Sequence, residues 1–427
     1  MNVLVLGSGG REHALAWRIS KSKLLKNLFI SPGNPGTAGI GKNIELEPGK
    51  QNIAEFCKTN DIDLVVIGPE QPLVEGLADF LRSENIKVFG PDGKAAEIEG
   101  SKSFAKELMQ KYSVPTAAYK EFDNTEYGDA SVYLKDYKFP AVIKADGLAA
   151  GKGVIICNNF IEAENALKEI FVEKAFGGAG SKIIIEEFLE GEEASILAVT
   201  DGDDYVLLPS SQDHKRIGEG DTGKNTGGMG AYSPAPVITS RILNEIESKI
   251  IEPVLEGMKK EGRKFSGCLY AGLMITSEGP KVIEFNCRFG DPETQAVLPL
   301  VGGDFLKLLY SAASGKLDKK AVNFPGGTAV CVVAVSGGYP GSYKKGLEIL
   351  GLEDTDTAEL IVFHAGTSRK EDRIITSGGR VLGVTAVLKE NDLQKARTLA
   401  YGALSRIKFK DMYYRRDIGI KALKRES

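Results

Sequence analysis

The chain has 427 residues, too many for one simple hydrophobic core, and this length predicts two to four domains. A content of 42% hydrophobic and 26% charged residues is typical of a soluble globular protein, and the net charge of −4 gives no electrostatic reason to expect nucleic acid or a membrane as a partner. No apolar stretch approaches the length of a membrane span, and the start of the chain lacks the features of a signal peptide, so we expect a cytoplasmic protein. The five scattered cysteines read as reduced core residues, and three separated histidines make a zinc site or a histidine-based triad an unfavourable hypothesis.

The first hundred residues alternate strands and helices. Strands are predicted at residues 3–6, 28–30, 63–67 and 88–89, a pattern typical of a small parallel α/β domain. The glycine turn after the first strand suits a phosphate or another anion at a helix N-terminus, but Glu12 stands where the dinucleotide fingerprint requires glycine. Loops that follow parallel strands share one edge of the sheet, so we expect Gly9, Gly10, Asn34 and Glu70 to lie together there.

Two lysine-bearing segments follow. Ser101 is the predicted N-cap of a helix that carries Lys102 and Lys106 on its polar face, and taken alone these are ordinary solvated lysines. A strand over residues 140–144 ends on Lys144, enters a glycine-rich loop with a second lysine, Lys152, and returns as a strand over 154–156. The spacing is not that of a P-loop, and we interpret the hairpin as a lid that folds over polyphosphate.

The next two segments are polar. A buried strand at residues 183–186 turns into an acidic loop, which can offer backbone groups to an adenine and a carboxylate to ribose hydroxyls. Residues 210–234 have almost no apolar content and are predicted to form a long substrate loop that carries Asp213 and Lys215. Beyond residue 325, strands at 329–335, 360–364 and 380–388 precede a helix at 391–407, which predicts a closing α+β domain.

The stretch from residue 282 to 293 carries the sharpest chemical signal. Strict alternation predicts a strand with Ile283, Phe285 and Cys287 on one face, and with Val282, Glu284 and Asn286 on the other. A carboxylate beside a neutral amide oxygen suits Mg²⁺, which is typically held by one or two carboxylates together with substrate phosphates. Arg288 follows with a planar fork of donors for a carboxylate or phosphate, and Asp291 lies at the same edge. The plainer alternative is an edge strand with a solvated polar face.

Six motifs occur in a specific order along the chain. They are GSGGREH at 7–13, GPE at 68–70, KADGLAAGKG at 144–153, QDHKR at 212–216, NTGGMG at 225–230 and FNCRFGDPET at 285–294. With them the chain resembles the ATP-grasp ligases and, more closely, the phosphoribosylamine–glycine ligase family over essentially its whole length. The resemblance implies a reaction in which ATP, glycine and 5-phosphoribosylamine give glycinamide ribonucleotide, ADP and phosphate through a glycyl phosphate, a step of purine biosynthesis.

The resemblance also implies cofactors and site residues. ATP would be contacted by Lys102 (preferred to Lys106), Lys106, Lys144, Gly147, Gly151, Lys152, Gly153, Glu186, Glu187, Phe188, Leu189 and Glu193. Mg²⁺ or Mn²⁺ would be bound by Glu284 and Asn286, without the third acidic ligand that many ATP-grasp enzymes carry on the preceding strand. The amino-sugar phosphate would be held by Gly9, Gly10, Glu12, Asn34, Glu70, Asn225 and Gly228. Glycine and the acyl phosphate would meet the catalytic set Asp213, Lys215, Arg288 and Asp291.

The implied fold class is α/β and α+β multidomain. We expect an N-terminal parallel α/β domain at 1–100, an ATP-grasp domain at 101–325 with a lid at about 120–192, and a C-terminal α+β domain at 326–427. The expected partners are small-molecule substrates, with no nucleic acid and no membrane, and the chain is expected to be a monomer. Three alternatives stay open: another ATP-grasp carboxylate–amine ligase or carboxylase of nucleotide metabolism, an NAD-dependent oxidoreductase, and a non-catalytic nucleotide-binding regulator.

Overall fold

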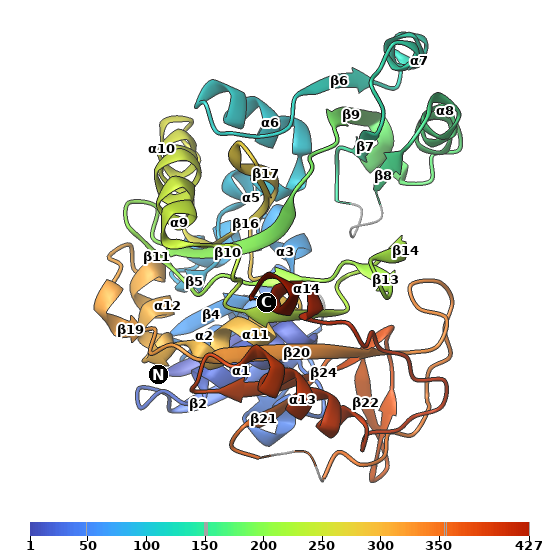
Figure 1. Cartoon of the computed structure of the whole chain (residues 1–427). Coiled ribbons are helices and arrows are strands. Elements are labelled where there is room, and N and C mark those ends of the chain that lie inside the picture. The colour runs from blue at the N-terminus through green and yellow to red at the C-terminus, as the bar shows by residue number, and fades with distance from the viewer. Residues whose placement is uncertain (48, 149–152, 354, 356, 427) are drawn as a thin grey trace.

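The N-terminal part of the chain is a parallel α/β unit. The structure is a computed structural model that describes residues 1–47, 49–148, 153–353, 355 and 357–426 (Figure 1). Five parallel strands are ordered β3-β2-β1-β4-β5. They are β1 (Asn2–Gly7), β2 (Asn27–Pro32), β3 (Lys42–Asn43), β4 (Leu64–Ile67) and β5 (Val88–Phe89), connected through α1 (Gly10–Ile19), α2 (Lys50–Thr59), α3 (Glu70–Val74) and α4 (Leu77–Ser83). The expected parallel sheet is confirmed, and the carboxyl ends of β1, β2 and β4 lie at one edge.

The expected lid is a separate antiparallel unit with its own core. Its strands are ordered β6-β9-β7-β8, and Figure 1 shows it at the upper right, away from the N-terminal sheet. The elements are β6 (Tyr119–Asp123), α7 (Tyr127–Lys135), β7 (Ala141–Ala145), β8 (Val154–Cys157), α8 (Phe160–Leu167) and β9 (Lys182–Glu187). The predicted hairpin is confirmed, because β7 pairs with β8 in antiparallel register. Apolar side chains of α7 and α8 pack with those of β7 and β9 to form the core of this unit.

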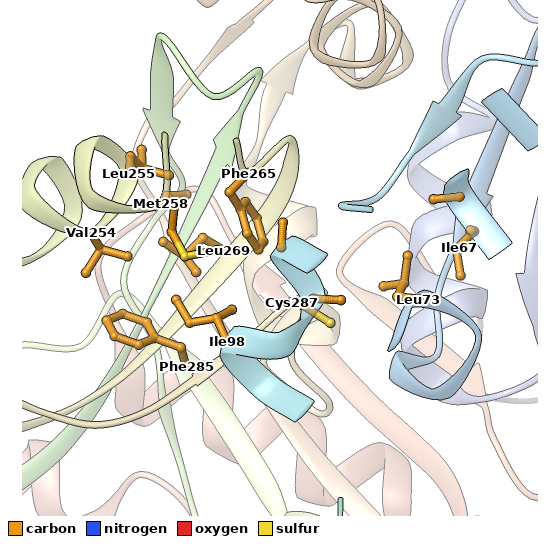
Figure 2. Close-up of a cluster of buried hydrophobic side chains, with 14 of the residues drawn as sticks. Ile67, Leu73, Ile98, Val254, Leu255, Met258, Phe265, Leu269, Phe285 and Cys287 are labelled. Atoms are coloured by element: carbon orange, nitrogen blue, oxygen red, sulfur yellow. The ribbon is translucent and has the colours of Figure 1, made fainter. Parts of the chain in front are cut away.

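A second antiparallel sheet, ordered β11-β10-β16-β17, carries the centre of the molecule. Its strands are β10 (Glu192–Thr200), β11 (Tyr205–Leu207), β16 (Gly267–Thr276) and β17 (Gly279–Asn286), packed with α5 (Gly93–Gly100), α6 (Lys102–Lys111), α9 (Ser240–Ile246) and α10 (Glu252–Lys260). Figure 2 shows Ile98 of α5 among Met258, Leu269 and Phe285 of this unit. The same cluster of buried side chains includes Ile67 of β4, so one core joins the N-terminal and central units.

The strand β17 contains a β-bulge that corrects the predicted alternation. Gly272 of β16 pairs with Glu284 and the next residue, Leu273, pairs with Val282, so Ile283 is the extra residue of the bulge. Val282 therefore turns into the core with Phe285, while Ile283 faces the cavity described below. The prediction that Val282 shares a face with Glu284 was wrong, because strict alternation fails where one residue is inserted into the ladder.

The C-terminal part is a five-stranded sheet ordered β12-β15-β20-β24-β21, covered by α13 (Leu393–Leu404). Its strands are β12 (Gln212–Asp213), β15 (Gly230–Ser233), β20 (Thr328–Val335), β21 (Leu360–His364) and β24 (Arg380–Leu388). The other elements here are β13 (Arg216–Gly218), β14 (Thr222–Asn225), α11 (Glu293–Val297), β18 (Gly302–Gly303), α12 (Phe305–Ala313), β19 (Val322–Asn323), β22 (Thr367–Lys370), β23 (Arg373–Thr376) and α14 (Ile420–Glu426). Within the described part of the chain, no helix is long and apolar enough to cross a membrane.

Residues 210–234 are not the long loop that their polarity predicted. Residues 212–213 and 230–233 form two strands of the C-terminal sheet, and residues 216–225 form the β13–β14 hairpin. Backbone hydrogen bonds join β15 to β20 and β12 to β15, and such bonds do not depend on an alternating apolar pattern. This segment from the middle of the chain therefore physically belongs to the sheet that the closing segment completes.

Candidate active site

One cavity of about 1170 Å³ collects side chains from every unit of the fold. The predicted site residues that line it are Glu70, Lys102, Lys106, Lys144, Gly153, Glu186, Glu187, Phe188, Leu189, Glu193, Asp213, Lys215, Asn225, Glu284, Asn286, Arg288 and Asp291. Gly151 and Lys152 lie outside the residues that the structure describes. Segments more than two hundred residues apart in the sequence therefore meet around one volume that is large enough for a nucleotide and a second ligand.

Two lysines of this cavity share one buried carboxylate. Glu186 lies 2.9 Å from Lys144 Nζ and 3.3 Å from Lys106 Nζ, and all three side chains are at most 6% exposed. Lys144 Nζ also donates to the Ile283 carbonyl oxygen at 3.0 Å, an acceptor that the bulge turns toward the cavity. Burial lowers the pKa of Lys106 to about 8. Lys106 is thus a buried ion-pair member, in contrast to the solvated lysine that its helix position alone indicated.

Lys102 is the first residue of α6, and Ser101 caps that helix as predicted by accepting from the Phe104 N–H group. Lys102 Nζ donates to the carbonyl oxygens of Asp146 and Gly147 at 3.3 and 3.0 Å, where the lid hairpin begins. Burial lowers the pKa of Lys102. The ammonium group therefore links the central unit to the base of the lid.

The segment after β9 runs along the cavity toward β10. Because Glu186 turns its carboxylate to the lysines, its remaining contribution to a ligand in the cavity is its backbone. Phe188 is 39% exposed, an unusual exposure for phenylalanine that fits a surface on which a flat ring stacks. Glu193 ends this run, and its carboxylate lies 2.9 Å from Lys215 Nζ.

Glu284 and Asn286 point into the cavity from the end of β17, beyond the bulge. Residue 272, opposite Glu284 on β16, is glycine, so the neighbouring strand adds no carboxylate. Among the described residues, no group of three or more histidine, cysteine, aspartate or glutamate side chains is placed to hold a metal ion. Burial favours the neutral form of Glu284, but nearby ammonium groups, that of Lys215 first, hold its pKa below the usual value. One carboxylate and one amide oxygen fit a Mg²⁺-type ion whose remaining ligands are phosphate and water.

A chain of alternating charges connects this site to the glycine turn after β1. Arg288 Nε donates to Glu70 Oε2 at 3.2 Å, and Arg288 Nη2 lies 3.1 Å from Glu99 Oε1. Arg11 lies 3.8 Å from the same Glu70 oxygen and donates to Glu12 Oε1 at 2.6 Å. Glu99 also accepts the Cys287 N–H group at 2.7 Å. Sequence reasoning singled out neither Arg11 nor Glu99, because isolated charged residues in helices are usually solvated.

The three N-terminal loops come together as predicted, but most of their functional groups are engaged within the protein. Gly9 N–H donates to Glu12 Oε2 at 2.7 Å. Asn34 Nδ2 donates to the carbonyl oxygens of Ser8 and His364, both at 2.9 Å, while Asn34 Oδ1 accepts two N–H groups of its own turn. The Asn34 side chain therefore joins the β1 and β2 loops to β21 of the C-terminal sheet.

The opposite wall of the cavity is formed by the C-terminal units. Asp213 lies at the end of β12, and burial raises its pKa, although the Lys215 ammonium group opposes this shift. Asp291 is ion-paired with Arg380 at 3.0 Å. Gly228 has a φ of +108° and approaches Pro292 so closely that a side chain has no room. The glycine is therefore required by both backbone and packing.

Several cavity residues were missed by sequence reasoning. They are Arg11, Glu99, Tyr270, Arg380, Lys421, Lys424 and Arg425. Tyr270 donates to Glu293 Oε1 at 3.0 Å, and both are buried. The spacing of Lys421, Lys424 and Arg425 places them on one helix face and was a usable signal for a basic surface.

Comparison with known proteins identifies the family. Family models described as the N domain, the ATP-grasp (A) domain and the C domain of phosphoribosylglycinamide synthetase match residues 1–99, 100–294 and 329–421. The chain belongs to this family. The expectation of an ATP-grasp ligase is thereby confirmed.

Relatives match this chain over its whole length. The phosphoribosylamine–glycine ligase of Caldanaerobacter subterraneus subsp. tengcongensis is 48% identical over 419 residues, which are 98% of this chain and 99% of that protein. The enzyme of the same name from Escherichia coli O6:H1 is 47% identical over 438 residues and covers 100% of both. The crystal structure of phosphoribosylamine–glycine ligase from Thermotoga maritima has a TM-score of 0.84 at 36% identity, covering 98% of this chain and 100% of that one. Biotin carboxylase from Campylobacter jejuni, at 14% identity and a TM-score of 0.75 over 99% and 95% of the two chains, shares the fold alone.

Proposed function

We propose that this enzyme joins glycine to 5-phosphoribosylamine in the cavity described above. Glycine's carboxylate attacks the γ-phosphate of ATP, which releases ADP and forms glycyl phosphate. The amine of phosphoribosylamine then attacks the glycyl carbonyl carbon, loses a proton, and displaces phosphate to give glycinamide ribonucleotide. One observation supports the proposal most: Arg288 Nε donates to Glu70 Oε2 at 3.2 Å, so the loop after β4 lies beside the end of the strand that carries Glu284 and Asn286.

In this proposal the lysines neutralise the polyphosphate. Lys102 and Lys144 contact the phosphates of ATP, and Lys106 keeps Glu186 in place beside Lys144. The backbone of residues 186–189 holds adenine, with Phe188 as a stacking surface, and Glu193 binds the ribose hydroxyls. Phosphoryl transfer depends mainly on positioning and charge neutralisation, so this arrangement suffices without a protein nucleophile.

Glu284 and Asn286 would hold Mg²⁺ or Mn²⁺. When bound, the ion supplies further neutralisation of phosphate charge. Lys215 Nζ lies 3.5 Å from Glu284 and 2.9 Å from Glu193, and we assign this ammonium group to the acyl phosphate.

The acceptor side of the site consists of Asp213, Lys215, Arg288 and Asp291, which we assign to glycine and the acyl phosphate. The amino-sugar phosphate is assigned to the turn of Gly9 and Gly10 and to Glu70, and the side chains of Glu12 and Asn34 shape that turn. Asn225 and Gly228 form the rim on the C-terminal side. We propose that the three domains meet at residues 100 and 325. We also propose that the protein is a cytoplasmic monomer that acts on these small molecules.

The decisive experiment measures ADP release from ATP and Mg²⁺ with glycine, with and without freshly made phosphoribosylamine. We expect turnover that requires both substrates and that Glu284→Ala abolishes. The matched control is Glu278→Ala in the turn between β16 and β17, where the side chain is 73% exposed, and it should retain wild-type turnover. Dependence on another acid or amine would reassign the substrates, and equal activity of Glu284→Ala and Glu278→Ala would refute the metal site.

A further inference from the structure

The C-terminal tail, residues 413–425, makes several hydrogen bonds to the β13–β14 hairpin. Arg415, which is fully buried, donates from Nη1 to the Arg216 carbonyl oxygen at 3.0 Å and to Asp221 Oδ1 at 2.8 Å. Tyr413 Oη donates to the Ile217 carbonyl oxygen at 3.1 Å. One buried guanidinium group therefore reaches both a strand and the turn of the hairpin.

Asp417 completes this contact from the side of the tail. Its two oxygens accept from Arg415 Nε at 2.8 Å and from Arg415 Nη2 at 2.6 Å, and Oδ2 also accepts the Gly220 N–H group at 2.8 Å. The arrangement uses several donors of a planar fork at once, which an ammonium group cannot reproduce. The contact is therefore specific for arginine at position 415.

Other contacts also reach the hairpin: Lys421 pairs with Asp221, the Arg416 N–H group donates to Glu219 Oε1 at 3.3 Å, and Ile217 packs against the C-terminal core. The hairpin consists of two short strands with a register shift, and most of β14 is exposed. A two-stranded hairpin is at best marginally stable by itself, so contacts to neighbouring segments determine where it lies. Among these contacts, the Arg415 side chain is the one that is completely removed from solvent.

This contact bears on the active site through Lys215. The following residue, Arg216, is held by Arg415, and the preceding residue, His214, accepts the Gly419 N–H group through Nε2 at 3.4 Å. The tail therefore holds both neighbours of Lys215, whose Nζ lies 2.9 Å from Glu193 in the cavity.

We propose that Arg415 is a positioning residue that fixes the β13–β14 hairpin and, through it, the Lys215 ammonium group on the acceptor side of the reaction. The inference rests on the proposed function, in which Lys215 contacts glycine and the acyl phosphate. The two lysines assigned to the phosphates of ATP have no share in this contact, because Lys102 is held by the carbonyl oxygens of Asp146 and Gly147 and Lys144 by that of Ile283. Loss of the contact should therefore affect glycine far more than ATP.

The test compares Arg415→Lys with Arg416→Lys, the same substitution at the neighbouring exposed side chain. Hydrogen–deuterium exchange on the full chain should show faster exchange of residues 216–225 in Arg415→Lys and unchanged exchange of residues 267–276. We expect kcat/KM for glycine to fall at least tenfold while the Kd for ATP stays within twofold. Arg416→Lys should match the wild type in all three measurements.

Asp417→Asn provides a second variant in case Arg415→Lys fails to fold, because it keeps the arginine and removes one partner charge. It should produce the same local exchange and the same selective loss for glycine. Unchanged exchange of the hairpin in both variants, or an equal loss of ATP and glycine binding, would overturn the inference. The exchange measurement needs no substrate, so a wild-type enzyme that fails to use glycine would count against the proposed function alone.

Discussion

The carboxylate of Glu186 offers the sharpest test of how the site is built. In Glu186→Gln the side chain keeps its size but loses the charge that lies 2.9 Å from Lys144 Nζ and 3.3 Å from Lys106 Nζ. Both ammonium groups are at most 6% exposed, so water cannot replace the missing charge. Removing one partner of a buried ion pair typically costs about 3–5 kcal/mol. Because the amide still accepts one hydrogen bond, we expect a loss of about 3 kcal/mol in the free energy of unfolding.

The assay is equilibrium unfolding in urea, followed by circular dichroism, with Glu261→Gln as the matched control. Glu261 pairs at 2.6 Å with Lys111, which belongs to α6 like Lys106. This pair is exposed, so removing its charge should cost little stability. Added ATP should stabilise Glu186→Gln more than the wild type, because the polyphosphate returns negative charge to Lys144. If Glu186→Gln loses no more stability than Glu261→Gln, the assignment of Glu186 as their counter-ion is refuted.

Two further predictions concern buried groups. Burial lowers the pKa of His13 to about 3 and of His214 and His364 to about 4, so between pH 6.5 and 4 only the unfolded chain binds these protons. The free energy of unfolding should therefore fall as pH drops through this window, by about 1.4 kcal/mol per pH unit for each histidine. In His13→Gln, urea titrations at several pH values should show a loss per pH unit that is smaller by about 1.4 kcal/mol. Glu99→Gln keeps an acceptor for the Cys287 N–H group but removes the charge that faces Arg288. Steady-state kinetics should then show at least a tenfold loss in kcat/KM for glycine at unchanged ATP affinity, and a parallel loss of ATP binding would contradict this role.

Much of the fold was predictable because its signals are local. The strand β1 and the helix α1 follow directly from an apolar run, a glycine turn and a helical pattern, and the lid hairpin follows from two apolar runs around a glycine-rich tip. The strands β12 and β15 were not predictable, because β12 pairs with β15, and β15 in turn pairs with β20, which lies about a hundred residues further along the chain. The bulge at Ile283 was missed for a related reason: it is defined by the register of two strands, and one strand's sequence does not contain that register.

The candidate site shows the same division. Lysines and carboxylates in motifs, such as Lys144 and Glu284, were found because their residue type and spacing indicate phosphate or metal binding. Arg11 and Glu99 are ordinary charged residues in the sequence, and they become notable only because folding buries them beside Glu70 and Arg288. Pairing between distant segments leaves no mark in the sequence of either segment. Burial combined with a charged partner is therefore the signal that the structure adds.

The alternating charges explain why the first, second and last motifs must occur together. Glu70 lies between Arg11 and Arg288 and pairs with both, and Glu99 contacts Arg288 from the other side. If Glu70 turned to a substrate amine or hydroxyl, the two guanidinium groups would share less negative charge and would attract an anion more strongly. The carboxylate of glycine and its phosphate adduct are such anions. Occupancy at the N-terminal loops would then favour binding of the acyl phosphate beside Glu284, which suits a reaction whose reactive intermediate must meet the amine before water does.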